Sequence, residues 1–219
     1  MTAESAGRRE DLIKLVARLV LDELARGPRI PLGVSNRHIH LNREDMDVLF
    51  GKGSELTRKK DLGQPGQYAS EETVSIKGPK GRIDEVRVLG PLRPDTQVEI
   101  SLSDGFALGV APPVRESGKL SGTPGIEIIG PTGSVRKEGS VIAALRHIHM
   151  SDKEAALYGF KDGEVVDAEI GSPERSAIFR NVLLRVSGKY ALEMHLDTDE
   201  ANAVGAKTGD FARIAGRGR

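Results

Sequence analysis

The sequence predicts a mainly β protein with short helices, built as two similar small β-barrel domains that share a central dinuclear metal site. An N-terminal amphipathic helix is expected before the first strand. Two observations carry the β prediction: many short runs of β-forming residues separated by Gly, Pro and Asp turns, and 26 glycines in a chain of 219 residues. A third observation, the near-duplication of one histidine-containing strand, predicts the twofold plan and the metal site.

The first expected element is an amphipathic helix over residues 9–26. An apolar stripe at helical spacing runs along it and consists of Ile13, Val16, Val20 and Leu24. Gly27-Pro28 ends the helix. Two interpretations stay open: the helix packs on its own domain, or it docks elsewhere as a detachable address, since it carries its own breaker.

Strands are expected over most of the remaining chain. The runs that alternate or cluster β-formers are 30–34, 73–77, 85–89, 97–102, 126–129, 165–170, 182–186, 191–196 and 211–214. Helices are expected to be few and short. Two capping boxes, at residues 42–45 and 151–154, each predict a helix of about two turns that ends near a glycine.

All five histidines lie in three short stretches. Residues 36–41 read Asn-Arg-His-Ile-His-Leu, residues 145–150 read Leu-Arg-His-Ile-His-Met, and the fifth histidine is His195. Side chains at i and i+2 of a strand share a face, so each pair aims two imidazoles at one spot. A single His-x-His is more often chance or a surface pair. Its duplication with the same Arg and Ile favours a metal centre of two ions.

The histidine strands open the two halves of an internal repeat, in which 99–102 is aligned with 193–196 and 107–109 with 203–205. In this alignment Glu99 lies near His195 and becomes a sixth candidate ligand. A solvated strand residue is the equal alternative for Glu99. A carboxylate beside imidazoles suits zinc, and an open coordination position would make the site catalytic.

Arg93 is a candidate anion-binding residue, because Gly90-Pro91-Leu92 and Pro94 bracket it in a stiff loop before the Glu99 strand. A surface arginine that caps a loop is the alternative. A Ser-His-Asp site is disfavoured, since Ser35 and Ser103 have no evident base other than the candidate metal ligands.

Composition narrows the possible partners and locations. Lys and Arg number 32 and equal the 32 Asp and Glu, so no net charge favours nucleic acid or an anionic membrane. The absence of Cys excludes disulfides and thiolate chemistry. No apolar run approaches the ~20 residues of a membrane span, and no signal core is visible, so a cytoplasmic location is expected.

Five stretches, residues 30–41, 64–69, 89–93, 146–150 and 192–202, give the chain a family resemblance. It resembles the PduL-type phosphate propanoyltransferases, the zinc-dependent phosphotransacylases of bacterial microcompartments. The resemblance runs from about residue 9 to 215. It implies interconversion of short-chain acyl-CoA, propanoyl-CoA above all, plus phosphate with acyl phosphate plus CoA.

The same resemblance implies an organisation and a cellular setting. The helix of residues 1–28 would be an encapsulation peptide that binds shell or cargo proteins and directs the enzyme into a microcompartment lumen. The first barrel would span 37–144, and the second 145–219 completed by strand 29–36. A homo-oligomer is expected, with neither nucleic acid nor membrane as a partner.

The resemblance also implies the roles of individual residues. His38, His40 and Glu99 would hold a zinc that meets the CoA sulfur. A second zinc, near phosphate, would be held by His147, His149 and His195. Arg93 would be catalytic and bind phosphate, and the CoA pocket would be lined by Ser35, Lys60, Arg87, Leu89 and Asn202. Co²⁺ or Fe²⁺ could replace Zn²⁺ at such ligands.

Two other functions remain open on the ligand set alone. A dinuclear metallohydrolase that cleaves phosphate esters would use the same ligands, but it needs a general base for water. A non-catalytic binding module would use closed metal sites to hold the barrels together.

Overall fold

The structure, a computed structural model, describes residues 3–218 and confirms the mainly β fold with short helices. The helices are α1 (Ala3–Arg26), α2 (Arg43–Phe50), α3 (Leu102–Leu108), α4 (Asp152–Tyr158) and α5 (Thr198–Val204). The strands are β1 (Arg29–Ser35), β2 (His38–His40), β3 (Arg58–Asp61), β4 (Tyr68–Lys77), β5 (Arg82–Gly90), β6 (Gln97–Glu99), β7 (Val114–Arg115), β8 (Ile126–Ile129), β9 (Ser134–Lys137), β10 (Val141–Ala144), β11 (His147–Met150), β12 (Val165–Ile170), β13 (Ala177–Val186), β14 (Glu193–Asp197) and β15 (Phe211–Arg217).

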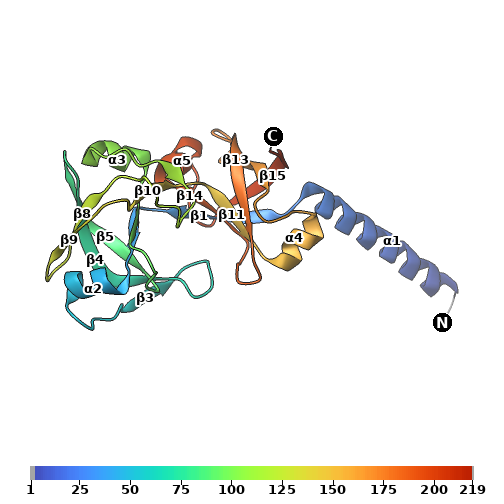
Figure 1. The fold of residues 1–219 in the computed structure, drawn as a ribbon. Coiled ribbons are helices and arrows are strands. Elements are labelled where there is room, and N and C mark those ends of the chain that lie inside the picture. Colours follow the sequence, from blue (N-terminus) through green and yellow to red (C-terminus); the bar gives the residue numbers. More distant parts are fainter. Residues whose placement is uncertain (1–2, 219) are drawn as a thin grey trace.

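Six strands form a closed barrel in the order β1-β14-β11-β13-β12-β15. It lies on the side of the molecule from which α1 projects (Figure 1). Its core includes Ile30, Ile148, Leu184 and Met194, which are fully buried. Alternate residues of β11 and β14 therefore point inward, and the residues between them point out of the barrel.

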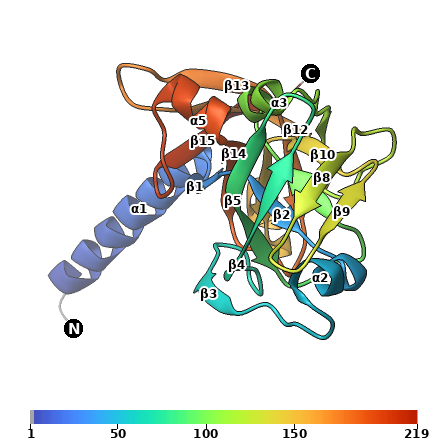
Figure 2. The same cartoon turned by 90° about the vertical axis from the view of Figure 1, so that its left-hand side faces the viewer.

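The other half is a curled sheet in the order β7-β10-β6-β2-β5-β4-β8-β9, with β3 paired to β4. Figure 2 shows β4, β5 and β8 of this sheet toward the viewer, with α3 and α2 near opposite ends. This sheet does not close as the first one does. At its open side, the amides of Ser140 and Val141 donate to the carbonyl of Pro124. Its buried core includes Ile39, Val98 and Ile128.

The two halves exchange strands. β1 runs parallel to β14 in the closed barrel, although β2, which follows it directly, belongs to the open sheet. In the same way, β10 runs parallel to β6 in the open sheet, and the next strand, β11, belongs to the barrel. Each histidine strand is thus preceded by a strand of the opposite half, which holds the two halves side by side.

Strand register corrects the internal alignment of the repeat. His38 pairs with Glu99, and His147 pairs with His195, so Glu99 is the counterpart of His195 and Gln97 that of Glu193. The alignment of 99–102 with 193–196 is therefore wrong by two residues. Pairing with the histidine strand decides the equivalence, and the resemblance between the two local sequences does not report that pairing.

The helix after β6 was not expected. The sequence predicts a strand to residue 102, but β6 ends at Glu99 and α3 begins at Leu102. Ser101 caps α3 by accepting a hydrogen bond from the amide of Asp104, whose carboxylate accepts from the amide of Ser101. Asp197 and Glu200 cap α5 in the same way. This N-cap was missed from the sequence because Ser101 follows a run of β-forming residues, and serine also occurs in strands and turns.

The expected N-terminal helix is confirmed as α1, which projects from the body of the molecule (Figure 1). Its large apolar side chains from Leu12 to Leu21 are 50% to 65% exposed. The interpretation in which this helix packs on its own domain is therefore wrong for the described side chains. In residues 3–218, no helix combines the length and apolar character needed to cross a membrane.

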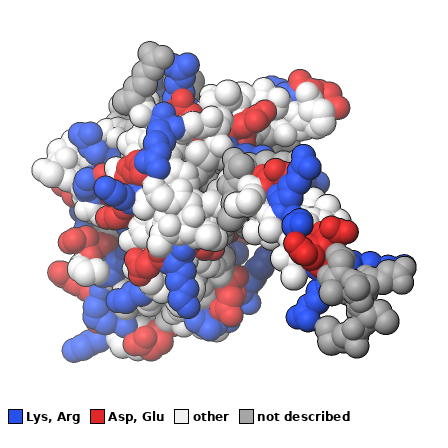
Figure 3. All heavy atoms as spheres, turned by 90° about the vertical axis from the view of Figure 1, so that its right-hand side faces the viewer, with Lys and Arg blue, Asp and Glu red and all other residues white. Residues whose placement is uncertain are grey.

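Charges of both signs are interspersed over the face seen in Figure 3. This mixture agrees with the equal numbers of acidic and basic residues. Attraction of an anionic substrate therefore has to come from a local arrangement of cations.

Each half anchors its histidine strand to its second helix through an arginine. Arg37 donates from Nε and Nη2 to both carboxylate oxygens of Asp104, at 2.9 and 2.7 Å. Arg146 and Glu200 form the equivalent pair at 2.6 Å. Because these residues directly precede His38 and His147, the ion pairs fix where the two histidine strands begin.

The first prediction concerns this anchor. Arg37→Ala is expected to lower the free energy of unfolding by about 2–3 kcal/mol, because removal of the cation leaves the buried Asp104 carboxylate unpaired. Chemical denaturation measures the change. Arg136→Ala, at an exposed ion pair, is the control and should cost less than about 1 kcal/mol. Equal stability losses in the two variants would contradict the role assigned to Arg37.

Candidate active site and metal centre

A cavity of about 750 Å³ contains most of the residues proposed from the sequence. The histidine strands β2 and β11 both contribute to its lining, as do β5, β6, β13 and β14. The predicted residues that line it are Ser35, His38, His40, Lys60, Arg87, Leu89, Arg93, Glu99, His147, His149 and His195. Asn202 is not among its lining residues; it is an exposed residue of α5.

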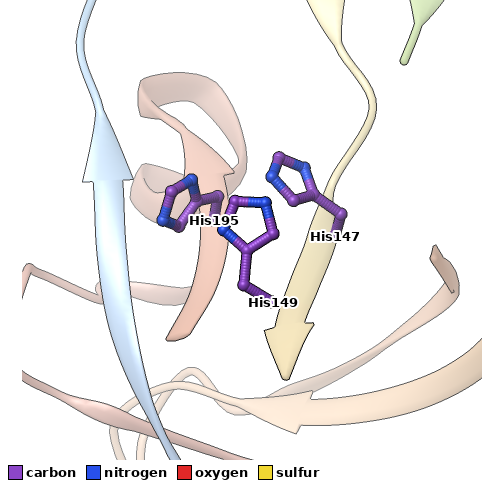
Figure 4. Close-up of side chains that lie close together, drawn as sticks. All are labelled: His147, His149 and His195. Atoms are coloured by element: carbon purple, nitrogen blue, oxygen red, sulfur yellow. The ribbon is translucent and has the colours of Figure 1, made fainter. Parts of the chain in front are cut away.

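Three of the lining residues form an all-imidazole group. His147 and His149 extend from β11 and His195 from the adjacent strand β14, and the three rings point toward one another (Figure 4). Each pair of ring centroids is 4.7–5.0 Å apart. One nitrogen from each ring lies within 4.8 Å of the others, close enough to share a metal ion.

The second group combines two imidazoles with a carboxylate. His38 and His40 extend from β2, and Glu99 from the paired strand β6. The carboxylate of Glu99 lies 3.4 Å from Nε2 of His38 and 3.9 Å from Nε2 of His40. Each group therefore has two ligands from a His-x-His strand and a third from its neighbour.

Hydrogen bonds to backbone carbonyls orient the first histidine of each pair. Nδ1 of His38 lies 2.8 Å from the carbonyl oxygen of Asn36, and Nδ1 of His147 lies 2.8 Å from that of Leu145. A carbonyl can only accept, so Nδ1 carries a proton in each ring, and in the neutral form of the ring Nε2 keeps a free lone pair. This tautomer is the one required for metal binding through Nε2.

The third residue of each group, Glu99 or His195, is held by a neighbouring side chain that complements its hydrogen-bonding character. The Glu99 carboxylate accepts from the side-chain amide of Gln97 and from the hydroxyl of Ser117. At the counterpart position, Nε2 of His195 donates to the Glu193 carboxylate at 2.8 Å. The Gln97 amide thus orients the Glu99 carboxylate, and the Glu193 carboxylate orients the His195 imidazole. Because Nε2 of His195 is used in this hydrogen bond, Nδ1 of His195 remains free to coordinate a metal ion.

Burial and mutual repulsion keep most of these imidazoles neutral. Burial and the charge of His195 lower the pKa of His147 to about 4. Burial and the charges of His147 and His195 lower the pKa of His149 to about 2. Burial and the charges of His38 and Arg93 likewise hold the pKa of His40 well below its ordinary value. Neutral imidazole is the form that binds a metal ion.

His38 and Glu99 behave as an ion pair. Burial is the largest single influence and lowers the pKa of His38, but the charge and hydrogen bond of Glu99, together with the hydrogen bond to the Asn36 carbonyl, raise the pKa above its ordinary value. Burial would raise the pKa of Glu99, yet the charge and hydrogen bond of His38 hold it well below its ordinary value. Glu99 is consequently ionised at neutral pH, the form in which a carboxylate can serve as a metal ligand.

The donor set fits metal ions. In the described part of the chain, the buried atoms Nδ1 and Nε2 of His149 and Nδ1 of His40 have no hydrogen-bond partner. An unsatisfied buried polar atom is costly, and coordination of one nitrogen per ring would offset that cost. Imidazole and carboxylate ligands without thiolate suit Zn²⁺, Co²⁺ or Fe²⁺.

Arg93 is held beside the His38 group. Its amide donates to the carbonyl of Leu41, and its Nη1 donates to the hydroxyl of Ser117 at 3.0 Å. Burial lowers the pKa of Arg93, although the charge of Glu99 acts in the opposite direction. A half-buried guanidinium at a cavity wall is suited to binding an anion.

Two cavity residues were missed from the sequence. Tyr190 stacks on His149 with ring centroids 4.2 Å apart and an interplanar angle of 13°. Arg185 lies on β13 directly beside His149 on β11. Both residues line the cavity. Only a correct pairing of β11 with β13 could have found them, because each has an ordinary local sequence.

Fold and site together define an enzyme whose active-site cavity is enclosed by a β-barrel and a curled β-sheet. Comparison with known proteins gives its family. A family model described as phosphate propanoyltransferase matches residues 31–207, and the chain belongs to this family of transferases.

Curated relatives carry the same description. The phosphate propanoyltransferase of Thermotoga maritima is 58% identical over 197 residues, which cover 90% of this chain and 94% of that protein. The Salmonella typhimurium phosphate propanoyltransferase is 50% identical over 208 residues, covering 94% of this chain and 98% of that protein. That of Rhodopseudomonas palustris is 58% identical over 186 residues, or 85% of this chain and 82% of that protein.

Proposed function

We propose that this phosphotransacylase converts propanoyl-CoA and phosphate to propanoyl phosphate and CoA, reversibly and with two zinc ions. The observation that carries the proposal is the convergence of both metal-ligand groups and Arg93 on one cavity. Ser35, Lys60, Arg87 and Leu89 line the same cavity and are proposed to bind CoA. Asn202 is proposed as a further CoA contact at its edge, from the family resemblance alone.

The proposed ligands are His38, His40 and Glu99 for one metal and His147, His149 and His195 for the other. When bound, such ions supply Lewis acidity, stabilise negative charge and accept a thiolate readily. Co²⁺ or Fe²⁺ would bind the same donors.

The residues themselves supply orientation and charge. Arg93 binds the phosphate and keeps it desolvated next to the thioester, so that attack occurs within a ternary complex. A phosphate oxygen forms a bond to the carbonyl carbon, and the bond from that carbon to sulfur breaks, so CoA leaves as a thiolate. The guanidinium offsets charge that develops on the reacting oxygens. No acyl-enzyme is required.

Thiol release from propanoyl-CoA tests this function on as-purified, chelator-treated and zinc-restored protein. Release that needs phosphate, disappears with the metal and returns with zinc is expected. Release without phosphate would identify a thioesterase. No release by folded, zinc-loaded protein would favour a phosphate-ester hydrolase or a metal-stabilised binding module. An acyl-enzyme trapped from labelled acyl-CoA would contradict direct attack.

The second prediction concerns Glu193, which orients His195. Its carboxylate also accepts from Nε2 of Gln64 at 3.0 Å, and Gln64 is only 4% exposed. Glu193→Gln should weaken metal binding at the His147 group by about 10- to 100-fold, because the acceptor for Nε2 of His195 loses its charge.

Competition with a chromogenic chelator measures this affinity. Glu169→Gln, an exposed change on β12 of the same barrel, is the matched control and should retain both metals. Unchanged chelator resistance in Glu193→Gln, or equal weakening of both metal sites, would contradict the orienting role.

We further propose the division of the chain that the family implies. Residues 1–28 form a targeting helix, 37–144 a first domain, and 145–219 with strand 29–36 a second domain. Pairing of β1 with β14 and β15 supports the last assignment. A homo-oligomer in the cytoplasm, enclosed in a microcompartment lumen, is part of the same proposal.

The third prediction concerns α1, which is proposed to dock on shell or cargo proteins. Its apolar side chains are exposed, so their burial against a partner would make the free energy of binding more favourable. A fluorescent protein fused to residues 1–28 should collect in shells, and the chain from residue 29 should keep its activity and thermal stability. Diffuse fluorescence in shell-forming cells would contradict the proposal.

A further inference from the structure

The two halves of the cavity differ at two successive pairs of equivalent positions beside the histidine strands: the open sheet carries the arginine at the first pair and the barrel carries it at the second. His38 on β2 lies beside Arg87 on β5, and His147 on β11 lies beside Leu183 on β13. Two residues further along these parallel pairs, Leu89 therefore corresponds to Arg185, which lies beside His149. Leu89 and Arg185 both line the cavity. One half thus presents an apolar side chain where the other presents a cation.

Packing sets Arg185 at the His149 side of the cavity. Its guanidinium carbon lies 5.8 Å from the centroid of the Tyr190 ring, and that ring is stacked on His149. Arg185, Arg93, His147 and His149 all line the same cavity. Arg93, held beside the His38 group, and Arg185, beside His149, therefore line one cavity from different halves.

In the described part of the chain, Arg93 and Arg185 lack carboxylate partners of the kind that Arg37 and Arg146 have. Arg37 and Arg146 are paired with Asp104 and Glu200. Among the described residues, Arg185 has neither an ion-pair partner nor a side-chain hydrogen bond, and the hydrogen bond of the Arg93 side chain goes to the Ser117 hydroxyl. Two cations kept at one cavity without carboxylate partners are arranged for an anion.

We propose that Arg185 is a second phosphate-binding residue, which acts with Arg93 to hold inorganic phosphate beside the His147 group. Leu89 at the equivalent place disfavours phosphate on the opposite side, so this pair of residues decides which half takes the phosphate and which takes the thioester. The inference rests on the proposed phosphotransacylase function. The phosphates of CoA share the same chemistry and are the competing source of the anion.

Arg185→Gln tests the assignment, with Arg180→Gln as the matched control. Arg180 lies on the same strand and its side chain is 74% exposed. A hydrogen bond to a charged group contributes about 1.5–3 kcal/mol, so Arg185→Gln should raise KM for phosphate about 10- to 100-fold. KM for propanoyl-CoA and the metal content should stay as in the wild type, and Arg185→Lys should lie between the two.

Calorimetric titration of zinc-loaded protein with inorganic phosphate, without acyl-CoA, gives a readout independent of turnover. It should show the same loss of affinity in Arg185→Gln and none in Arg180→Gln. If wild-type protein binds phosphate but releases no thiol, the proposed function fails, and this titration still tests Arg185.

Unchanged phosphate affinity in Arg185→Gln would overturn the inference. An increase in KM for propanoyl-CoA alone would also overturn it and assign Arg185 to the phosphates of CoA. If Arg185→Gln does not fold, Arg185→Lys decides the question. An unchanged KM for phosphate in Arg185→Lys would then overturn the inference, because an intermediate KM is expected.

Discussion

Replacing His149 with alanine is expected to remove one of the two proposed metal equivalents and to lower kcat by about a thousandfold. Bound metal ions contribute several kcal/mol to charge stabilisation, and about 1.4 kcal/mol corresponds to a factor of ten in rate. His149 is buried in the centre of the all-imidazole group, and its two ring nitrogens have no other partner among the described residues. Metal analysis and thiol-release kinetics measure the two effects.

The matched variant is His40→Ala, which should remove the other metal equivalent and leave the His147 group loaded. Comparing the two separates metal loss from general damage, since His40 is as deeply buried on the counterpart strand. Two retained metal equivalents with wild-type kcat in His149→Ala would exclude His149 as a ligand.

Arg93→Gln is expected to lower kcat/KM for phosphate by about a hundredfold to a thousandfold. Loss of one preorganised donor at a desolvated reacting centre has this order of effect. Arg93 donates to the Ser117 hydroxyl, which in turn donates to Glu99, so the guanidinium lies between the Glu99 group and the proposed phosphate subsite. Steady-state kinetics with phosphate as the varied substrate measure the change.

Arg93→Lys is the informative companion, because it keeps the charge and loses the planar fork. Intermediate activity would separate charge from geometry. Ser117→Ala should cost less than Arg93→Gln, since Gln97 still donates to Glu99. Equal kcat/KM in Arg93→Gln and the wild type would exclude phosphate binding by Arg93, whatever the fate of the metal ligands.

Much of the candidate site could be predicted from local pattern. The duplicated His-x-His identifies four ligand candidates because alternation on a strand is a local property. Glu99 was nominated through an alignment that proved to be two residues out of register, and it lies beside His38 because β2 and β6 pair there. The correct counterpart of His195 is visible only from the two pairings, since register depends on residues that are 61 positions apart for His38 and Glu99 and 48 positions apart for His147 and His195.

The residues that distinguish the two halves were outside the reach of the sequence. Arg185 and Tyr190 contact the His149 region only after β13 has crossed over to run parallel to β11. Gln97 and Glu193, by contrast, support Glu99 and His195 from two positions earlier on the same strand, a contact that strand alternation makes local. Local sequence predicts which side chains share a face, but contacts across a crossover depend on which strands become neighbours.

Helix α1 shows the same division between local and tertiary control. An apolar stripe and the breaker at Gly27-Pro28 were enough to predict a helix. They could not decide whether the stripe would be covered, because that depends on whether the body of the molecule offers a matching apolar face.

The sequence by itself determined the β-rich class, the N-terminal helix and the two histidine pairs, since these follow from periodicities of two and 3.6 residues. The family resemblance already implied that strand 29–36 completes the second barrel. Only the tertiary structure decided that one sheet closes while the other stays open, that β10 crosses to the open sheet, and that Arg185 corresponds to Leu89 in the repeat. Those features depend on long-range pairing, whose free energy comes from burying whole strands against one another and from no single local motif.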